Sequence, residues 1–439
     1  MPVTKVEFER SVHRGLGRAV LWLQRGEIVP DRDFLLYACT HNLAYDRQTE
    51  DNRALHLFDI IQATGEPSYY ARAIEKALEE VGESDNWEED ERSIEQMFDL
   101  LDLLAKNDDL TARQSLYQLF AKFATHSGGS GADALVDMDG LDGYLFVVRH
   151  WILHPQEEED CWYETSLLED VEQRFGKDEA QAFLAQVAQT EPAVGVYLAG
   201  VREKQADEEA RRKRRPKQHK PDSAEIRQTL LDFDKRFNRP QMWRWGERMS
   251  NADAERFGAE LLAETDPKRL ERYLHLFHKR AFPLDHAPLL ALAQSADPAI
   301  AKTARAALAQ IAAPEVRALA LKLMDTDPQP WDGIGMLVTN FCTGDEQAVE
   351  RVVGSCWDED EMHWLTLDVL RLVEANPQPS FAGALMQIYE EGYCTMCRHG
   401  VLKLLADIGP LPPSVIEECH YDADKETRKV MQEARHGPA

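Results

Sequence analysis

The sequence VLRLV at residues 369–373 returns as VLKLL at residues 401–405, 32 positions further along the chain. Pro379 and Pro412 follow the two copies, and each precedes a further apolar stripe at helical spacing. Proline is favoured in the first turn of an α-helix, where its missing N–H leaves no bond unmade. The C-terminal part of the chain is therefore predicted to repeat a helix, a turn and a second helix.

The same period extends upstream, and helical spacing extends through both halves of the chain. Leu308 lies 62 positions, or two periods, before Leu370, and Pro314 opens the next apolar stripe. In the N-terminal half, apolar residues recur at spacings of three and four, as expected for amphipathic helices. One such stripe consists of Ile94, Met97, Phe98, Leu101 and Leu104. Alternating strand patterns are scarce, so we predict an all-α fold.

Glycines and aspartates interrupt the helical spacing between residues 128 and 148. The aspartates Asp133, Asp137, Asp139 and Asp142 are oxygen ligands of the kind that calcium prefers, but an EF-hand loop needs Gly at position 6 and Glu at position 12. The spacing here does not fit that pattern. We therefore expect Asx turns that hold an ordered connecting loop.

Three groups of residues give the chain a likeness to a known family. They are Asp297, Pro298, Ala304, Arg305, Ala307 and Leu308; Cys397, Arg398, Val401, Leu404, Leu405, Ile408 and Gly409; and Asp422, Asp424, Thr427 and Arg428. On these residues the chain resembles the HEAT and armadillo-type α-solenoid repeat proteins, most clearly over residues 285–435. The resemblance implies an α-α superhelix of stacked helix pairs, with extended surfaces that bind proteins and no shared catalytic residues.

The net charge of −28 is spread unevenly along the 439 residues. Residues 1–200 carry −22, whereas residues 201–220 carry +5. The segment from Arg211 to Lys220 has no apolar side chain except Pro216, so it is expected to be a solvated linker. We predict two helical halves: an acidic domain over residues 1–200 and a HEAT-like domain over residues 223–439. A basic linker at residues 201–222 joins them.

The composition favours a soluble protein of a reducing compartment. The longest apolar runs are five or six residues, whereas a membrane-spanning helix needs about 20. No export signal is visible in the first twenty residues, which several charged side chains interrupt. Seven cysteines, an odd number, do not fit a disulfide framework. We expect a cytoplasmic chain with no membrane contact and no cofactor.

Two short patterns contain residues that bind metals in other proteins. Cys394 and Cys397 form a C-x-x-C pair, but no second pair with suitable spacing accompanies it. His150 and His154 stand four apart, but Trp151 occupies the position where a zincin has Glu. We therefore expect all four residues to be packing residues and no metal to be bound.

The sequence contains no P-loop, dinucleotide-binding, nucleophile-elbow or kinase motif. Together with the repeat and the acidic first half, this absence favours a non-catalytic scaffold or adaptor for protein–protein interactions. An acidic solenoid surface attracts partners of opposite charge. The expected partner is a protein with a basic surface.

The alternative is a HEAT-like protein that binds or modifies nucleic acid through the basic segment 202–280, since phosphate contacts come from clusters of Lys and Arg. The near-neutral balance of residues 221–320 argues against it. Nine residues are candidates for contact with an anion or partner. They are Arg211, Arg212, Lys213, Arg214, Arg215, Arg239, Arg244, Trp245 and Arg248.

Overall fold

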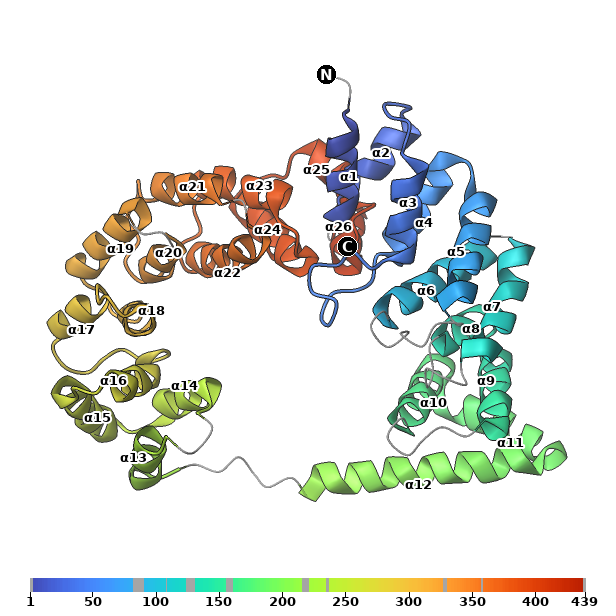
Figure 1. The fold of residues 1–439 in the computed structure, drawn as a ribbon, viewed down its shortest axis with the longest axis horizontal. Coiled ribbons are helices and arrows are strands. Elements are labelled where there is room, and N and C mark those ends of the chain that lie inside the picture. The colour runs from blue at the N-terminus through green and yellow to red at the C-terminus, as the bar shows by residue number, and fades with distance from the viewer. Residues whose placement is uncertain are drawn as a thin grey trace. The chain divides into compact units, whose positions relative to one another are not determined.

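The structure is a computed structural model of the 439-residue chain (Figure 1). It describes residues 3–81, 91–107, 109–123, 131–154, 161–214, 221–233, 237–326, 330–356 and 358–436. These residues contain 26 α-helices and no strand, which confirms the predicted all-α class. No helix within these ranges is both long enough and apolar enough to cross a membrane.

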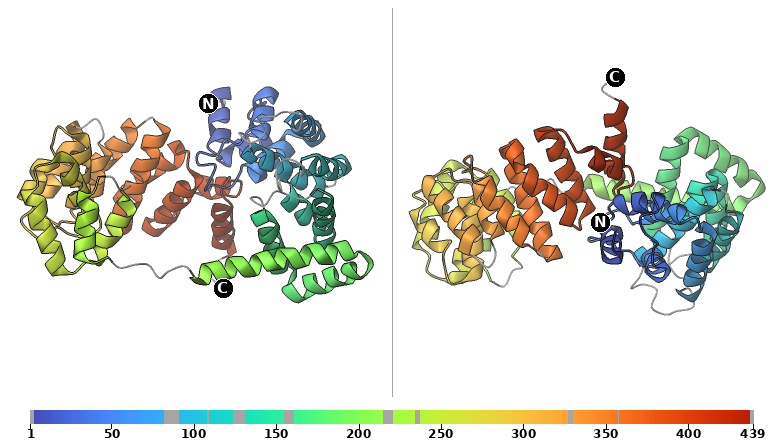
Figure 2. Two further views of the ribbon diagram at one scale, coloured as in Figure 1. Left: turned by 60° about the horizontal axis from the view of Figure 1, so that its bottom comes forward. Right: turned by 90° about the horizontal axis from the view of Figure 1, so that it is seen from above.

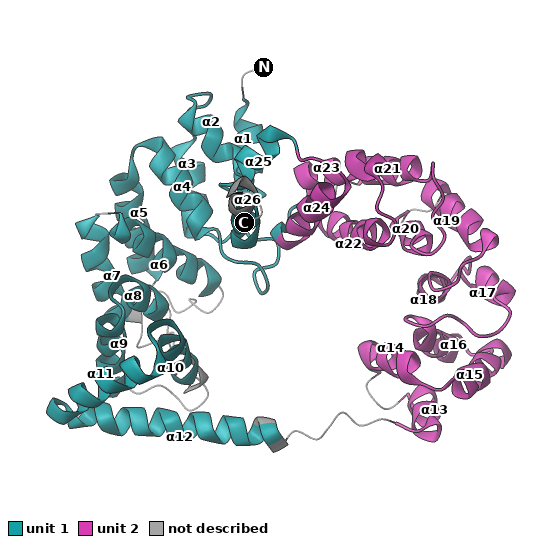
Figure 3. Ribbon diagram, turned by 180° about the vertical axis from the view of Figure 1, so that it is seen from behind, with its two compact units in different colours: residues 1–215, 393–395, 412–439 teal, residues 216–392, 396–411 magenta. Residues whose placement is uncertain are grey.

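The chain divides into two compact units (Figure 3). Unit 1 comprises Met1–Arg215, Tyr393–Thr395 and Pro412–Ala439, and unit 2 comprises Pro216–Gly392 and Met396–Leu411. This division differs from the one expected, because the last residues of the chain fold with the N-terminal helices and not with the second half.

The bounds of the helices are as follows. Unit 1 contains α1 (Lys5–His13), α2 (Arg18–Gln24), α3 (Arg32–Thr40), α4 (Ala54–Thr64), α5 (Pro67–Val81), α6 (Glu91–Lys106), α7 (Leu110–Phe123), α8 (Ala132–Asp139), α9 (Leu141–Leu153), α10 (Cys161–Phe175), α11 (Lys177–Thr190), α12 (Pro192–Arg214), α25 (Pro413–Cys419) and α26 (Lys425–His436). The helices of unit 2 are α13 (Ser223–Leu231), α14 (Arg239–Arg248), α15 (Asn251–Ala263), α16 (Pro267–Leu274), η2 (His275–Phe277), α17 (Ala287–Leu292), α18 (Pro298–Leu308), α19 (Pro314–Thr326), α20 (Trp331–Leu337), α21 (Glu346–Ser355), α22 (Glu359–Ala375), η3 (Pro379–Phe381), α23 (Ala382–Glu391) and α24 (Thr395–Ile408), the first residue of which belongs to unit 1.

The prolines that the repeat placed at helix starts do stand there. Pro314 is the first residue of α19, Pro379 begins the 3₁₀ turn before α23, and Pro412 is the N-cap of α25. At α18 the side chain of Asp297 accepts a hydrogen bond from the N–H of Ala299 at 3.0 Å. An aspartate N-cap accepts a hydrogen bond from a free N–H group of the first helical turn, and proline lacks an N–H there. These local residues therefore start the helix without contacts from other helices.

The helices of unit 2 pack in two layers (Figure 1). In one layer α16, α18, α20 and α22 touch in succession, and in the other α19, α21 and α23 do so. The two copies of the repeated sequence lie in α22 and α24. A Cβ on Gly400 of α24 would lie 3.2 Å from the Leu370 side chain of α22, so these two helices pack closely. The arrangement is compatible with a helical repeat.

Unit 1 has one continuous hydrophobic core, which runs from Phe8 on α1 to Val201 on α12. Helices α4, α6 and α8 touch in succession, as do α5 and α7. Tyr144 and Trp151, both on α9, are among its largest fully buried side chains. Alternating helices of this unit therefore also form layers, although their sequence period is blurred.

The expected loop at residues 128–143 is wrong within its described part, residues 131–143, because α8 and the first residues of α9 occupy it. Gly131 and Gly140 adopt positive φ angles of 88° and 62° at the starts of these two helices. A Cβ on Gly143 would lie 2.0 Å from the carbonyl oxygen of Leu135, so glycine allows the two helices to touch. The glycines serve helix junctions and close packing here, not a long connector.

The basic segment begins as helix, not as a solvated linker, because α12 continues to Arg214. The acidic residues at 207–209 precede the basic ones, an order that suits both the helix dipole and ion pairs four residues apart. The Nζ atom of Lys213 lies 2.7 Å from Glu209 Oε1. Residues 215–220 lie outside the described ranges.

The C-terminal helices α25 and α26 pack beside the N-terminal helices of unit 1 (Figures 1 and 2). Arg18 Nε donates to Glu418 Oε1 at 2.8 Å, and the N–H of Ala423 donates to the carbonyl of Gly15 at 2.9 Å. Arg428 extends the contact by donating to Asp59 at 2.7 Å. Unit 1 is thus built from both ends of the chain.

Candidate partner-binding surface

A row of carboxylates follows one face of α6 in unit 1. Glu95, Asp99 and Asp102 stand four and three residues apart, a spacing that places side chains on the same side of a helix. Burial raises the pKa of each of the three carboxyl groups, and that of Asp99 rises to about 6. Asn52 opposes this shift at Asp99, because its Nδ2 donates to the carboxylate at 2.7 Å.

Neighbouring helices bring more negative charge to this row. Burial is the main cause of the raised pKa values of Glu95, Asp99 and Asp170, and the charge of Asp133 on α8 raises all three further. Asp133 therefore lies within electrostatic range of carboxylates on both α6 and α10. We define the acidic surface as Glu95, Asp99, Asp102, Asp133, Asp137 and Asp170.

Cationic side chains pair with some members of the acidic surface. Lys106 Nζ lies 2.7 Å from Asp102 Oδ2, whereas Asp102 Oδ1 is buried with no hydrogen-bond partner among the described residues. Arg174 pairs with Asp137, and its Nε lies 2.6 Å from Asp170. Arg92 pairs with Glu95 at 2.9 Å. The charge of Lys425 on α26 also acts on Asp99 and lowers its pKa. The cations named here are thus four, against six carboxylates.

Two aspartates of the expected connecting loop, Asp137 and Asp139, form ion pairs. Asp139 pairs with Arg113 and accepts a hydrogen bond from the hydroxyl of Tyr117 at 2.5 Å. Asp137 pairs with Arg174, as described above. Their carboxylates are engaged by cations of α7 and α10, which is unlike the oxygen set of a calcium loop.

The nine predicted anion-binding residues fall into two groups in different units. Arg211 and Lys213 are exposed on the last turns of α12 in unit 1, and the helix also includes positions 212 and 214. Arg215 lies outside the described residues. Arg239, Arg244, Trp245 and Arg248 all belong to α14 in unit 2.

Trp243 on α14 makes specific contacts with two histidines. Its Nε1–H donates to His275 Nδ1 at 3.2 Å, and its ring stacks on His278 with centroids 4.2 Å apart. Burial lowers the pKa of each histidine to about 4, so both are neutral at pH 7. Arg239 is paired with Glu271 at 3.2 Å. This cluster therefore adds little positive charge for an anion.

His150 and His154 lie at the end of α9 with ring centroids 4.6 Å apart. His150 is buried, its ring meets Phe120 edge-on, and its pKa is lowered by burial and by His154. Neither histidine belongs to a cluster of three metal-ligating side chains among the described residues. His150 is thus packed in the core, whereas His154 is exposed.

Cys397 Sγ lies 3.5 Å from His363 Nδ1 on α22, within unit 2, whereas Cys394 belongs to unit 1. His363 was not among the residues that the sequence singled out, although it precedes Cys397 by 34 residues, close to one period. One period upstream is where a residue on the neighbouring helix of a repeat stands.

Comparisons with known proteins do not assign the chain to a family. No family model, no curated protein and no solved structure matches it. The function of the chain is therefore inferred from its residues and their contacts.

Proposed function

We propose that the protein is a non-catalytic, HEAT-like α-solenoid scaffold whose acidic surface binds a basic segment of another protein. The row Glu95, Asp99 and Asp102 is the observation that carries the proposal. Each of these carboxyl groups has a raised pKa, which means that the folded protein disfavours their ionised forms. A bound cation would relieve that cost, so the surface suits a cationic partner.

The pH dependence of stability has the sign that this argument requires. The pKa of Asp99 is about 6 in the folded protein, against an ordinary value of 3.8. Because the folded state holds its proton more tightly, folding loses stability as pH rises from about 4 to 6. Above that range the protein carries a partly buried charge whose compensation by lysine or arginine is favourable.

Binding of a fluorescently labelled oligolysine peptide to the full chain at low salt tests the proposal. We expect the triple variant Glu95→Gln, Asp99→Asn, Asp133→Asn to bind about tenfold more weakly, since each surface charge pair contributes about 0.2–1 kcal/mol. Added salt should weaken binding to the unaltered chain, because it screens exposed charges.

A matched control separates this surface from the overall charge of the protein. The variant Glu79→Gln, Glu80→Gln, Glu203→Gln removes three exposed carboxylates of unit 1 outside the acidic surface. It has the same net charge as the triple variant and should bind the peptide like the unaltered chain. Equal losses in both variants would show that net charge alone attracts the peptide and would contradict the proposal.

The second candidate function is nucleic-acid binding by unit 2. It is supported by the exposed side chains of Arg244 and Arg248 on α14. The pairing of Arg239 and the neutral His275 and His278 weigh against it. A single-stranded oligonucleotide that bound more tightly than oligolysine at the same salt would favour this function, especially if Arg244→Ala with Arg248→Ala abolished the binding.

A further inference from the structure

Helix α12 of unit 1 is much longer than the helix that it packs against. Glu191 alone separates α11 from α12, so the two helices are antiparallel neighbours, and they contact each other. α11 has 14 residues and α12 has 23. The last turns of α12 therefore continue about 13 Å beyond the start of α11 (Figures 1 and 2).

The part of α12 that continues beyond α11 ends in exposed cations. Lys204 still contacts the body of unit 1, because its Nζ lies 3.0 Å from Glu164 Oε2 on α10. Further along the helix, Arg211 and Lys213 are exposed, and Lys213 pairs with Glu209 of the same helix at 2.7 Å. We define the basic end of α12 as Arg211 and Lys213.

The acidic surface of the same unit contains a buried carboxylate oxygen without a donor. Asp102 is 4% exposed, and its Oδ1 has no hydrogen-bond partner among the described residues. Burial raises the pKa of Asp102, and the charges of Arg174 on α10 and Asp139 on α8 also act on it, so its carboxylate lies within range of both helices. A buried acceptor without a donor is costly, and a cation from another molecule would supply one.

The basic end and the acidic surface have complementary charge, and every copy of the chain carries both. The sequence from 211 to 214 has four basic residues and no acid. Within one molecule α12 is a continuous helix held by α10 and α11, so its end cannot turn back toward α6 and α8. A second copy can present the same end freely. If two copies exchange these ends about a two-fold axis, the same contact forms twice and the dimer is closed.

We propose that two copies of the chain associate, with the basic end of α12 of each copy bound to the acidic surface of the other. The inference rests on the proposed function, because it identifies a second copy as a carrier of the basic segment. The net charge of −28 opposes association. Salt of about 0.1 M, with a Debye length of about 10 Å, screens this long-range repulsion more than it screens the charges in contact.

Sedimentation velocity of the full chain at about 0.1 M salt, over about a hundredfold range of concentration, tests the proposal. We expect the mass to rise from one chain to two as concentration increases. The variant Arg211→Gln, Lys213→Gln should dimerise about tenfold more weakly, because small contributions from exposed charge pairs are lost in both contacts. The control Arg72→Gln, Lys76→Gln removes two exposed cations of α5 and should dimerise like the unaltered chain.

A mixture of two variants tests which surfaces meet. One is Arg211→Gln, Lys213→Gln, and the other is the triple variant Glu95→Gln, Asp99→Asn, Asp133→Asn. Each variant alone lacks one side of both contacts. In the mixture, the intact helix end of the triple variant meets the intact acidic surface of the other variant, so one contact is restored. We expect the mixture to form more dimer than either variant alone at the same total concentration.

The proposal is overturned if the unaltered chain remains a single chain over the whole range, or if the control weakens dimerisation as much as Arg211→Gln, Lys213→Gln. It is equally overturned if the mixture associates no better than the separate variants. Oligolysine binding is measured on the same samples. A chain that binds oligolysine but does not dimerise contradicts this inference alone, whereas absence of oligolysine binding contradicts the proposed function. Circular dichroism of each variant distinguishes lost association from lost folding.

Discussion

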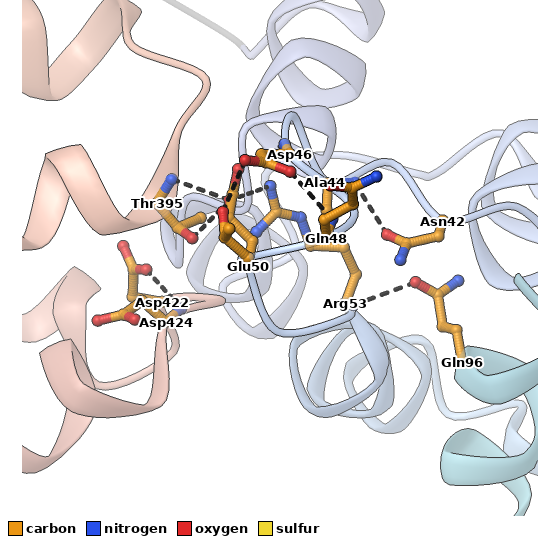
Figure 4. A network of polar contacts seen from close by, with 11 residues as sticks. Asn42, Ala44, Asp46, Gln48, Glu50, Arg53, Gln96, Thr395, Asp422 and Asp424 are labelled. Atoms are coloured by element: carbon orange, nitrogen blue, oxygen red, sulfur yellow. Dashed lines mark hydrogen bonds and ion pairs between the residues drawn. The ribbon is translucent and has the colours of Figure 1, made fainter. Parts of the chain in front are cut away.

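Replacement of Glu50 by alanine is expected to lower the free energy of unfolding of unit 1 by about 3–5 kcal/mol, the range measured when one partner of a buried ion pair is removed. The side chains of Glu50 and Arg53 are 0% and 1% exposed, and Arg53 Nη2 lies 3.4 Å from Glu50 Oε2 (Figure 4). The same carboxylate caps Thr395 and accepts from the N–H of Asp46 at 2.9 Å. The variant therefore leaves a buried cation without its carboxylate.

Urea denaturation followed by circular dichroism measures this effect. Glu80→Ala is the control, since Glu80 forms an exposed pair with Lys76 whose side chains are 68% and 75% exposed. An exposed pair of this kind contributes only about 0.3–0.5 kcal/mol. If Glu50→Ala and Glu80→Ala shifted the denaturation midpoint equally, the buried network around Glu50 would not stabilise unit 1 as described.

Replacement of Gly17 by alanine is expected to loosen the C-terminal helices from unit 1. A Cβ at this position would lie 1.9 Å from the carbonyl oxygen of Glu418 and 2.9 Å from the Tyr421 side chain. The nearest clashing atom belongs to the backbone, which cannot relieve the clash by changing rotamer as a flexible side chain can. We expect a loss of about 3 kcal/mol, the upper end of the usual cost of overpacking.

Limited proteolysis and thermal melting test the Gly17→Ala variant. The region from Pro412 to His436 should become the earliest site of cleavage, because α25 and α26 no longer pack against α1 and α2 in their native positions. Gly200→Ala is the matched control: a Cβ there meets nothing within 4 Å, and alanine is favoured over glycine inside a helix. Equal protection of both variants would show that α25 tolerates displacement from Gly17.

The parts of the fold that the sequence predicted depend on local signals. The repeated segment at 369–373 and 401–405 lies in two helices that pack on each other, and the prolines stand at helix starts. Apolar spacing and helix capping act over a few residues, so they can be read without tertiary information. The all-α class could likewise be predicted from apolar residues at helical spacing.

The missed features depend on contacts between residues far apart in the chain. Arg18 and Glu418 are 400 residues apart, and no local pattern indicates that they meet. The acidic row on α6 was hidden within an apolar stripe, because only the packing of α8 and α10 reveals that its carboxylates share one surface. The helical continuation of α12 was missed because the basic run was considered without the acidic residues that precede it.

For the acidic surface, the sequence predicted the sign of the charge and not the position in the fold. An acidic first half pointed to a cationic partner, but the charge count did not locate the surface. Cys394 and Cys397 were set aside for lack of a further ligand, whereas the structure brings His363 on α22 to Cys397.

The affinity of the full chain for oligolysine at different pH values tests the central claim most directly. Lysine stays charged across this range, since its pKa is about 10.4. Burial raises the pKa of Asp99 to about 6, so protonation of this carboxyl group should weaken binding as pH falls from about 7 to 5. We predict a loss of about threefold to tenfold in the unaltered chain, equivalent to at most about one pKa unit of interaction energy, and a smaller loss in Asp99→Asn. Binding that did not change with pH, or that changed equally in both proteins, would contradict the claim that the acidic surface on α6 binds the cation.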